Sequence, residues 1–138
     1  MKVQLQTMLP ADIERRSMEI IGQLLKEQEI TLDPVLEPVI KRVIHTTADF
    51  DYAKNLVFSQ NAIQKAQDAI RAGASIVTDT QMARSGINKS VLSGYGGEVF
   101  CFMSDADVAD AAKQKGTTRA VASMDKALSI KKPLIFAI

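Results

Sequence analysis

The second half of the chain alternates short apolar runs with segments of helical pattern, and this alternation restricts the possible folds more than any other feature. The apolar runs have the length and composition of buried strands and cover residues 75–79, 99–103 and 133–138. Helices are expected between them, over 80–85, from Asp105 to Gly116, and after a cap at Thr117 or Thr118. Strands separated by helices pair in parallel, so the sequence predicts an α/β fold with a mainly parallel sheet.

The first half is predicted to be mainly helical. Apolar residues at helical spacing indicate one helix over 11–29. A second helix ends near His45 and begins either at Asp33–Pro34, as N-cap and first residue, or only near Pro38, because proline disturbs a helix interior. The segments expected next are a short strand at 56–58, a helix from Ser59 or Asn61 to Gly73, and a Gly- and Ser-rich loop over 88–97.

Length and composition are those of a globular protein with one domain, residues 1–138. Seventeen basic and sixteen acidic side chains give a net charge of +1, which argues against a general nucleic-acid-binding protein. One cysteine excludes an intrachain disulfide, and one cysteine with one histidine argues against a zinc site or another bound metal. No segment has the pattern of a membrane span or a signal peptide, so we expect a cytoplasmic protein that binds no membrane.

The polar stretch that begins at His45 is the first candidate for chemistry. His45 is the only histidine, and two threonines and two aspartates follow it within six positions. Histidine is the side chain best suited to carry protons near neutral pH, which makes His45 a candidate general acid. The alternative is a histidine that ends a helix and hydrogen bonds to a nearby carboxylate. Asp49 and Asp51 either orient His45 or contact a ligand, or they cap the next element.

Several other polar residues have both a functional and a structural interpretation. Thr78 and Thr80 follow a predicted strand at the expected mouth of the sheet, where they line a site or cap the next helix. Arg119 lies in the first turn of a predicted helix, against the helix dipole, and either grips an anionic group or is simply solvated. Arg16 and Ser17 lie on the first helix. The glycine-rich loop 93–97 lacks the lysine and spacing of a P-loop.

The segment 41–51, KRVIHTTADFD, resembles the signature of the precorrin-8X methylmutases. Further matches follow in the same order along essentially the whole chain. They comprise Ile13-Glu14 and Arg16-Ser17, Val77-Thr78-Asp79-Thr80 with Met82, Gly86-Ile87-Asn88-Lys89, Gly96-Gly97-Glu98, Ser104-Asp105, and Thr118-Arg119-Ala120.

The resemblance implies a flavodoxin-like three-layer α/β fold and a homodimer. It implies an isomerase of cobalamin biosynthesis that moves a methyl group from C-11 to C-12 of precorrin-8X or cobalt-precorrin-8, giving hydrogenobyrinate or cobyrinate. The segments 86–89 and 96–98 favour the cobalt-containing substrate of the oxygen-independent branch. No cofactor is implied. By this resemblance His45 is the catalytic general acid, and the substrate is bound by Arg16, Ser17, Thr46, Thr47, Asp49, Thr78, Thr80 and Arg119.

The resemblance also implies a missing part. Members of the family continue beyond the strand at 133–138 into a Gly-Asn-Ala-Pro-Thr-Ala-Leu segment, so we expect a chain that is incomplete at its C-terminus. The sequence leaves two alternatives to a methylmutase. One is a corrinoid-binding protein without catalysis, which would use the same pocket, and the other is a small hydrolase built on Ser17, His45 and Asp49.

Overall fold

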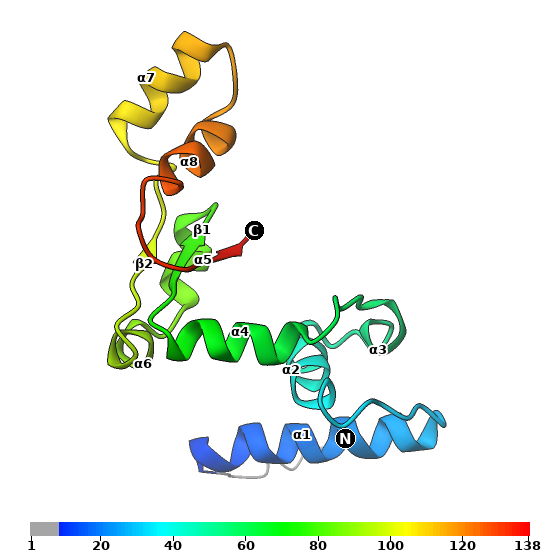
Figure 1. Ribbon diagram of the computed structural model, residues 1–138. Helices are drawn as coiled ribbons and strands as arrows, with labels where there is room; N and C mark the ends of the chain where they lie inside the picture. Colours follow the sequence, from blue (N-terminus) through cyan, green and yellow to red (C-terminus); the bar gives the residue numbers. More distant parts are fainter. Residues whose placement is uncertain (1–8) are drawn as a thin grey trace. The chain divides into compact units, whose positions relative to one another are not determined.

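The computed structural model describes residues 9–138, which form two compact units (Figure 1). The first unit extends to Ile63 and the second runs from Gln64 to Ile138. Within the described residues, no helix is both long and apolar enough to cross a membrane. Each unit has its own set of elements and is described separately.

The described part of the first unit, residues 9–63, contains the helices α1 (Pro10–Glu27), α2 (Glu37–Thr47) and the short α3 (Tyr52–Asn55). Proline stands at the start of both α1 and α2, where its missing N–H costs nothing. Between the helices, the carboxylate of Asp33 accepts from the backbone N–H of Val35 at 2.7 Å, and this stabilises a turn over 34–36. The second helix therefore begins next to Pro38, the later of the two predicted starts.

A small core joins α1 to α2. Its buried side chains come from both helices and are Ile21, Leu25, Ile40 and Ile44. Their spacing of four residues on each helix puts them on one face, as the sequence pattern indicated. The strand predicted at 56–58 is wrong: this segment is irregular, and Val57 is 93% exposed. Its short apolar run had no strand to pair with, and Leu56 and Phe58 pack against the helical core instead.

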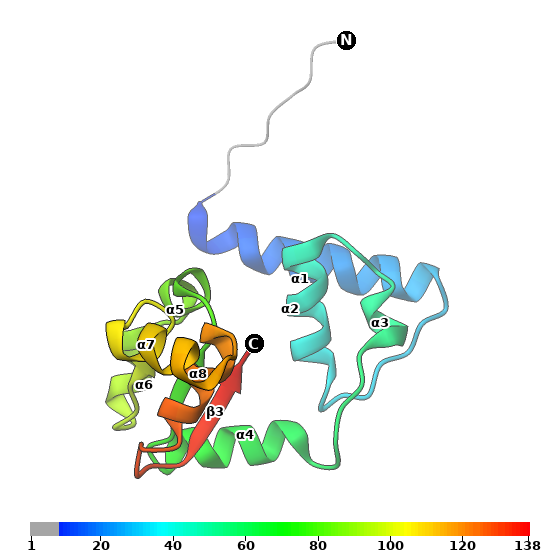
Figure 2. The ribbon, with the colours of Figure 1, turned by 90° about the horizontal axis from the view of Figure 1, so that it is seen from above.

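The second unit carries the sheet. After α4 (Ala62–Arg71), which begins at the boundary, it contains β1 (Ser75–Thr78), α5 (Gln81–Gly86), α6 (Lys89–Gly94), β2 (Val99–Phe100), α7 (Ala106–Lys115), α8 (Arg119–Ala127) and β3 (Leu134–Ala137). The strand order is β2-β1-β3, and both pairings are parallel. Figure 2 shows the edge strand β3 among the helices of this unit. The α/β class with a parallel sheet is thus confirmed.

Two predicted elements of this unit differ from the structure. The loop expected over 88–97 contains the helix α6, because the side chain of Asn88 accepts from the N–H of Val91 and caps a helical turn. The strand expected over 99–103 is only two residues long. It pairs with β1 at Val99 and Phe100, and the chain turns away at Met103 before α7 begins.

Candidate active site

His45 occupies the last turn of α2, and its imidazole is exposed. The preceding residue, Ile44, is 1% exposed and packs in the core between α1 and α2. Burial of Ile44 holds the backbone beside His45 in place. The helix then stops at Ala48, which adopts the left-handed conformation (φ 57°). His45 is thus positioned by the end of α2 and by the buried Ile44 beside it. The sequence pattern predicted this location at a helix end.

The hydroxyl of Ser17 meets this imidazole from the neighbouring helix. Ser17 Oγ on α1 lies 2.7 Å from His45 Nδ1 on α2. Three residues earlier on both helices, the guanidinium of Arg42 pairs with the carboxylate of Glu14. These two polar links and the shared core hold α1 and α2 together around His45.

An apolar groove of about 400 Å³ opens beside His45. Three polar residues line it, Arg16, Ser17 and His45, and the rest of its wall is apolar: Ile13, Ile20, Ile21, Leu24, Ile44, Ala48 and Phe50. The groove therefore brings three of the predicted site residues together on one wall. A basic group, a hydroxyl and an imidazole at the edge of an apolar surface suit a ligand that is largely apolar and carries carboxylates.

Thr46 and Thr47 follow His45 and have their hydroxyls turned back onto the helix. Thr46 donates to the carbonyl of Arg42 at 3.0 Å, and Thr47 donates to the carbonyl of Val43 at 2.9 Å. A hydroxyl that has donated its proton can only accept from a further partner, whereas a carboxylate offers only acceptors. In this arrangement the two hydroxyls suit ligand groups that donate rather than a carboxylate.

Asp49 stabilises the turn that follows α2. Its backbone N–H donates to Thr47 Oγ1 at 3.2 Å, and its carboxylate accepts from the N–H of Asp51 at 2.9 Å. Within residues 9–138, no carboxylate lies within 4.0 Å of a nitrogen of the His45 imidazole. A Ser-His-Asp arrangement needs such a carboxylate to orient the ring. The geometry therefore does not favour the hydrolase alternative.

The other three predicted substrate contacts lie in the second unit. Thr78 is fully buried at the carboxyl end of β1, and its hydroxyl lies within hydrogen-bond distance of the carbonyls of Thr80 and Phe100. Thr80 caps α5 by accepting from the N–H of Ala83 at 3.1 Å, and it is exposed. Arg119 is the first residue of α8 and is also exposed. Among residues 9–138, no carboxylate lies within ion-pair distance of it.

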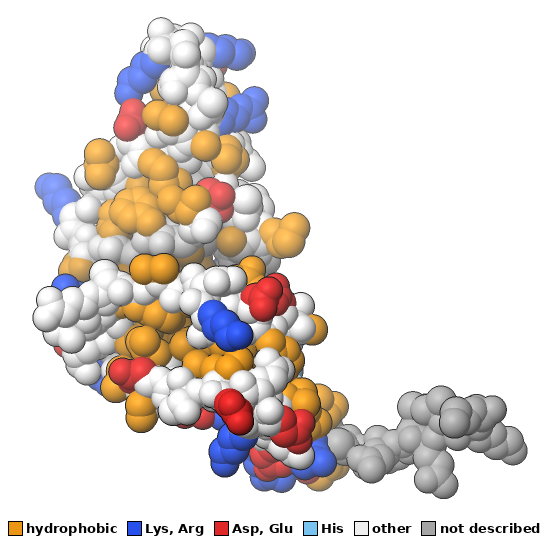
Figure 3. All heavy atoms as spheres, turned by 90° about the vertical axis from the view of Figure 1, so that its right-hand side faces the viewer, with side chains coloured by type: hydrophobic (Ala, Val, Ile, Leu, Met, Phe, Trp, Pro, Cys, Tyr) orange, Lys and Arg blue, Asp and Glu red, His pale blue; other side chains and the backbone are white. Residues whose placement is uncertain are grey.

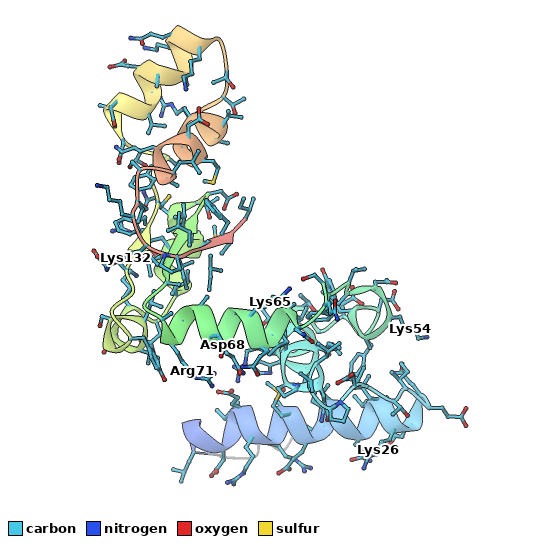
Figure 4. All side chains as sticks on the ribbon, in the orientation of Figure 1. Lys26, Lys54, Lys65, Asp68, Arg71 and Lys132 are labelled. Atoms are coloured by element: carbon cyan, nitrogen blue, oxygen red, sulfur yellow. The ribbon has the colours of Figure 1, made fainter. Side chains whose placement is uncertain are left out.

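The glycine-rich segment 93–97 lies at the opposite end of the strands. It leads from α6 into the amino end of β2, and Lys132 donates to the carbonyl of Gly96 at 2.9 Å (Figure 4). Ligand sites of parallel sheets form beyond the carboxyl ends of the strands. The segment is therefore a turn that supports the sheet.

A second hollow of the first unit, about 540 Å³, has a charged lining that includes Lys26, Glu37 and Lys41. Lys41 is paired with Glu37 one helical turn earlier, so part of its charge is already neutralised. Within the described residues, no three side chains of His, Cys, Asp or Glu gather in a way that could hold a metal ion. The apolar groove beside His45 thus remains the site with the clearest acid–base group.

Comparison with known proteins decides the family. The family model described as precorrin-8X methylmutase matches residues 12–138, which is nearly the whole chain. The chain belongs to the precorrin-8X methylmutase family. A cobalt-precorrin-8 methylmutase from Salmonella typhimurium is 45% identical over 123 residues, covering 87% of this chain and 59% of that protein. One from Priestia megaterium is 40% identical over 132 residues, covering 96% and 58%.

A solved structure agrees with this family. The precorrin-8X methylmutase of Thermus thermophilus is 36% identical and superposes with a TM-score of 0.69, covering 86% of this chain and 55% of that one. The methylmutase fold expected from the sequence is therefore confirmed over the shared part. The chain spans less than two thirds of the length of each of these relatives.

Sequence reasoning missed the apolar wall of the groove. Ile13, Ile20 and Leu24 belong to the apolar stripe that predicts the helix over 11–29, but they are 54%, 43% and 37% exposed. The available signal was the width of that stripe. Packing against α2 buries only part of this apolar stripe. The apolar residues of α1 that stay exposed line the groove beside His45.

Proposed function

We propose that this methylmutase chain acts on a corrin precursor, moving its methyl group from C-11 to C-12 as an isomerase of cobalamin biosynthesis. The product would be hydrogenobyrinate from precorrin-8X or cobyrinate from cobalt-precorrin-8. One observation carries the proposal. The only histidine of this family member, His45, lines an apolar groove together with Arg16.

The groove suits the chemistry of such a substrate. A corrin precursor has a flat apolar ring with acetate and propionate carboxylates at its rim. The apolar wall would cover part of the ring, and the guanidinium of Arg16 would bind a rim carboxylate. Arg16 is free enough for this, since its side chain is 58% exposed and its contact with Glu19 is 3.3 Å long.

In the proposed reaction His45 is the general acid. Protonation of the macrocycle favours migration of the methyl group, and the same proton must return afterwards, because an isomerisation neither gains nor loses one. The methyl group moves within a single molecule, so the reaction requires neither an electron donor nor a cofactor. The protein therefore has three tasks: it binds the ring, excludes water from one face of the ring and transfers one proton.

Family membership alone does not specify the substrate form, the domain organisation or the assembly, and we propose each of them separately. We favour the cobalt-containing substrate, because the Salmonella and Priestia relatives are both named for it. We treat the two units as one methylmutase domain, because the family match runs through both. We also propose a cytoplasmic homodimer without a nucleic-acid or membrane partner. Sedimentation would measure the mass of the proposed dimer.

The charged surface fits a small acidic substrate bound by individual residues. Figure 3 shows basic and acidic side chains interspersed over one face. With a net charge of +1, attraction of the substrate's carboxylates depends on particular basic residues such as Arg16 and Arg119 rather than on a broad positive field.

The test is a turnover assay in which the change in the absorbance spectrum of the corrin precursor reports its conversion. We expect His45→Ala to lower kcat by about 10²- to 10⁴-fold while still binding the product, because only the proton transfer is lost. Lys54→Ala, an exposed change on α3 away from the groove, is the control and should leave kcat unchanged. Full turnover by His45→Ala would remove the general-acid role. Tight product binding by the unaltered chain without turnover would instead favour a corrinoid-binding protein.

A further inference from the structure

Ser17 uses its hydroxyl differently from other helical hydroxyl residues of this chain. Thr46, Thr47 and Ser85 each donate to the carbonyl four residues earlier in their own helix. Ser17 lies in the interior of α1, yet its oxygen reaches across to α2 and meets His45 Nδ1 at 2.7 Å. The contact therefore joins two helices through residues 28 positions apart in the sequence.

We propose that Ser17 is a positioning residue that holds Nδ1 of His45 and leaves Nε2 as the nitrogen that exchanges a proton with the substrate. This inference rests on the proposed function of His45 as a general acid. It gives Ser17 a role other than the substrate contact expected from the sequence, since its hydroxyl is already engaged with the imidazole. The neighbouring Arg16 then remains as the anchor for a carboxylate at this wall.

A hydroxyl suits this task because its oxygen accepts a hydrogen bond without carrying a charge. When the imidazole is charged, Nδ1–H donates to Ser17 Oγ. When Nε2 has given up its proton, the neutral ring still donates from Nδ1 to Ser17 Oγ. The ring therefore keeps the same orientation in both protonation states. A carboxylate in the same place would favour the charged ring and oppose release of its proton.

The proton transfer balances with Ser17 in this position. The Nε2–H bond of the charged imidazole breaks, its electron pair stays on Nε2, and the proton adds to the macrocycle. The neutral ring keeps its proton on Nδ1, where it donates to Ser17 Oγ. After the methyl group has moved, the proton returns from the macrocycle to Nε2. The enzyme ends the cycle in its starting state, as an isomerisation requires.

The packing on both sides of Ser17 and His45 keeps this distance short. On α1, Ser17 is half-buried between Glu14, which pairs with Arg42, and Ile21, which lies in the core. On α2, the buried Ile44 adjoins His45. The two side chains are therefore presented by backbone that is fixed on each helix. Such support is what a hydrogen bond needs in order to orient a catalytic ring.

The chain offers a direct measurement, because its single histidine gives one unambiguous set of imidazole signals. Nitrogen-15 NMR of the free protein reports which ring nitrogen carries the proton. In the unaltered chain at a pH where the ring is neutral, we expect the proton mainly on Nδ1, donated to Ser17 Oγ. In Ser17→Ala we expect a mixture of the two tautomers that approaches that of a free histidine, and Ser17→Thr should restore the original signals because it keeps the hydroxyl.

Kinetics supply the second readout. Ser17→Ala should lower kcat about 10- to 100-fold through misorientation of the ring, with little change in KM, and Ser17→Thr should recover most of that loss. Ser85→Ala removes a helical hydroxyl that bonds within its own helix and is the matched control, expected to change neither readout. Circular dichroism of each variant verifies that it is folded.

Two outcomes would overturn the inference. Imidazole signals of Ser17→Ala identical to those of the unaltered chain would show that Ser17 does not control the tautomer. A raised KM with unchanged kcat would make Ser17 a substrate contact instead. The NMR measurement needs no substrate, so it separates this inference from the proposed function. If the tautomer depends on Ser17 but no corrin precursor is turned over, the proposed function fails and the contact between Ser17 and His45 stands.

Discussion

At Gly97 the backbone of the second unit passes so close to the start of β1 that no side chain fits. A Cβ atom at this position would lie 2.2 Å from the carbonyl oxygen of Ala74 and 3.0 Å from the side chain of Leu92. Ala74 is fully buried and immediately precedes β1. Glycine is required here by the close approach of two backbone segments rather than by its φ angle.

Gly97→Ala should therefore destabilise the protein. The clash involves backbone on one side, which cannot move aside as a flexible side chain would, so we expect a loss of about 1–3 kcal/mol or more in the free energy of unfolding. Urea denaturation followed by circular dichroism measures it. Gly94→Ala is the control, because its Cβ would meet nothing within 4 Å. It should be neutral or gain up to about 1 kcal/mol. Equal stabilities for the two variants would contradict the close approach at Gly97.

Other residues act through hydrogen bonds within one or two turns of their own position. Thr118 and Thr80 cap the helices that follow them, as the sequence indicated for both. Asp68 on α4 accepts from Gln64 and from Arg71 (Figure 4). Caps such as Thr80 and Thr118 depend on residue type and position alone, which is why the sequence located the starts of α5 and α8.

Between elements, Lys126 links α8 to α7. Its ammonium lies 2.6 Å from a carboxylate oxygen of Asp105 and 2.8 Å from one of Asp107, and it sits 5.2 Å from the centre of the Phe102 ring. The hydrogen bond from Lys126 lowers the pKa of Asp107 below its ordinary value. The hydrogen bonds to Asp105 and Asp107 raise the pKa of Lys126. Each group thus stabilises the charged form of its partner.

The stabilisation from this cluster should depend on pH. Because the pKa of Asp107 is lowered on folding, its contribution is present above the unfolded value of about 3.9 and is lost as the pH falls through the folded value. Because the pKa of Lys126 is raised, its contribution is present below about pH 10.4 and is lost as the pH rises further. The full stabilisation by the cluster is therefore expected between about pH 4 and pH 10.

We expect Lys126→Met to be less stable than the unaltered chain between about pH 5 and 9, with a difference that shrinks below about pH 4. The cluster is solvent-exposed, so 1 M salt should also reduce the difference. Denaturant unfolding at a series of pH values measures it. Lys113→Met on α7 is the control, since Lys113 makes no ion pair within residues 9–138. A difference that stays constant down to pH 2 would rule out this ionic contribution.

At the scale of the whole molecule, the two edges of the sheet differ. One edge is β2, which is only two residues long, and a short edge offers little backbone for another chain to pair with. The other is β3, a four-residue strand that pairs only with β1 among the described residues. Phe136 is 43% exposed and Ile138 is 85% exposed at this edge.

An apolar edge of this kind should promote self-association of the 138-residue chain at high concentration. Ile138→Lys should reduce that association, because a charge at an edge strand opposes pairing with a second strand. Light scattering over a concentration series measures the effect. Val57→Lys is the control, since Val57 is 93% exposed but lies outside the sheet. The same reduction by both variants would mean that general charge, and not the strand edge, limits association.

The sequence by itself determined the features with local causes. Pro10 and Thr118 set helix starts, Gly116 ends α7 in the left-handed conformation, and the apolar runs predicted parallel strands. The ordered motifs around His45 also indicated the family, which the family match confirms. These features depend on neighbouring residues or on a pattern along the chain, so they can be read without a three-dimensional arrangement.

Only the tertiary structure decided which polar groups meet. The strand predicted at 56–58 is absent because its residues pack against helices, and Thr78 is buried because β2 lies beside β1. The contact of Ser17 with His45 arises because the α1–α2 core brings together residues 28 positions apart. Residue type and spacing do not reveal such a contact, since it depends on how two helices pack side chains that are remote in sequence.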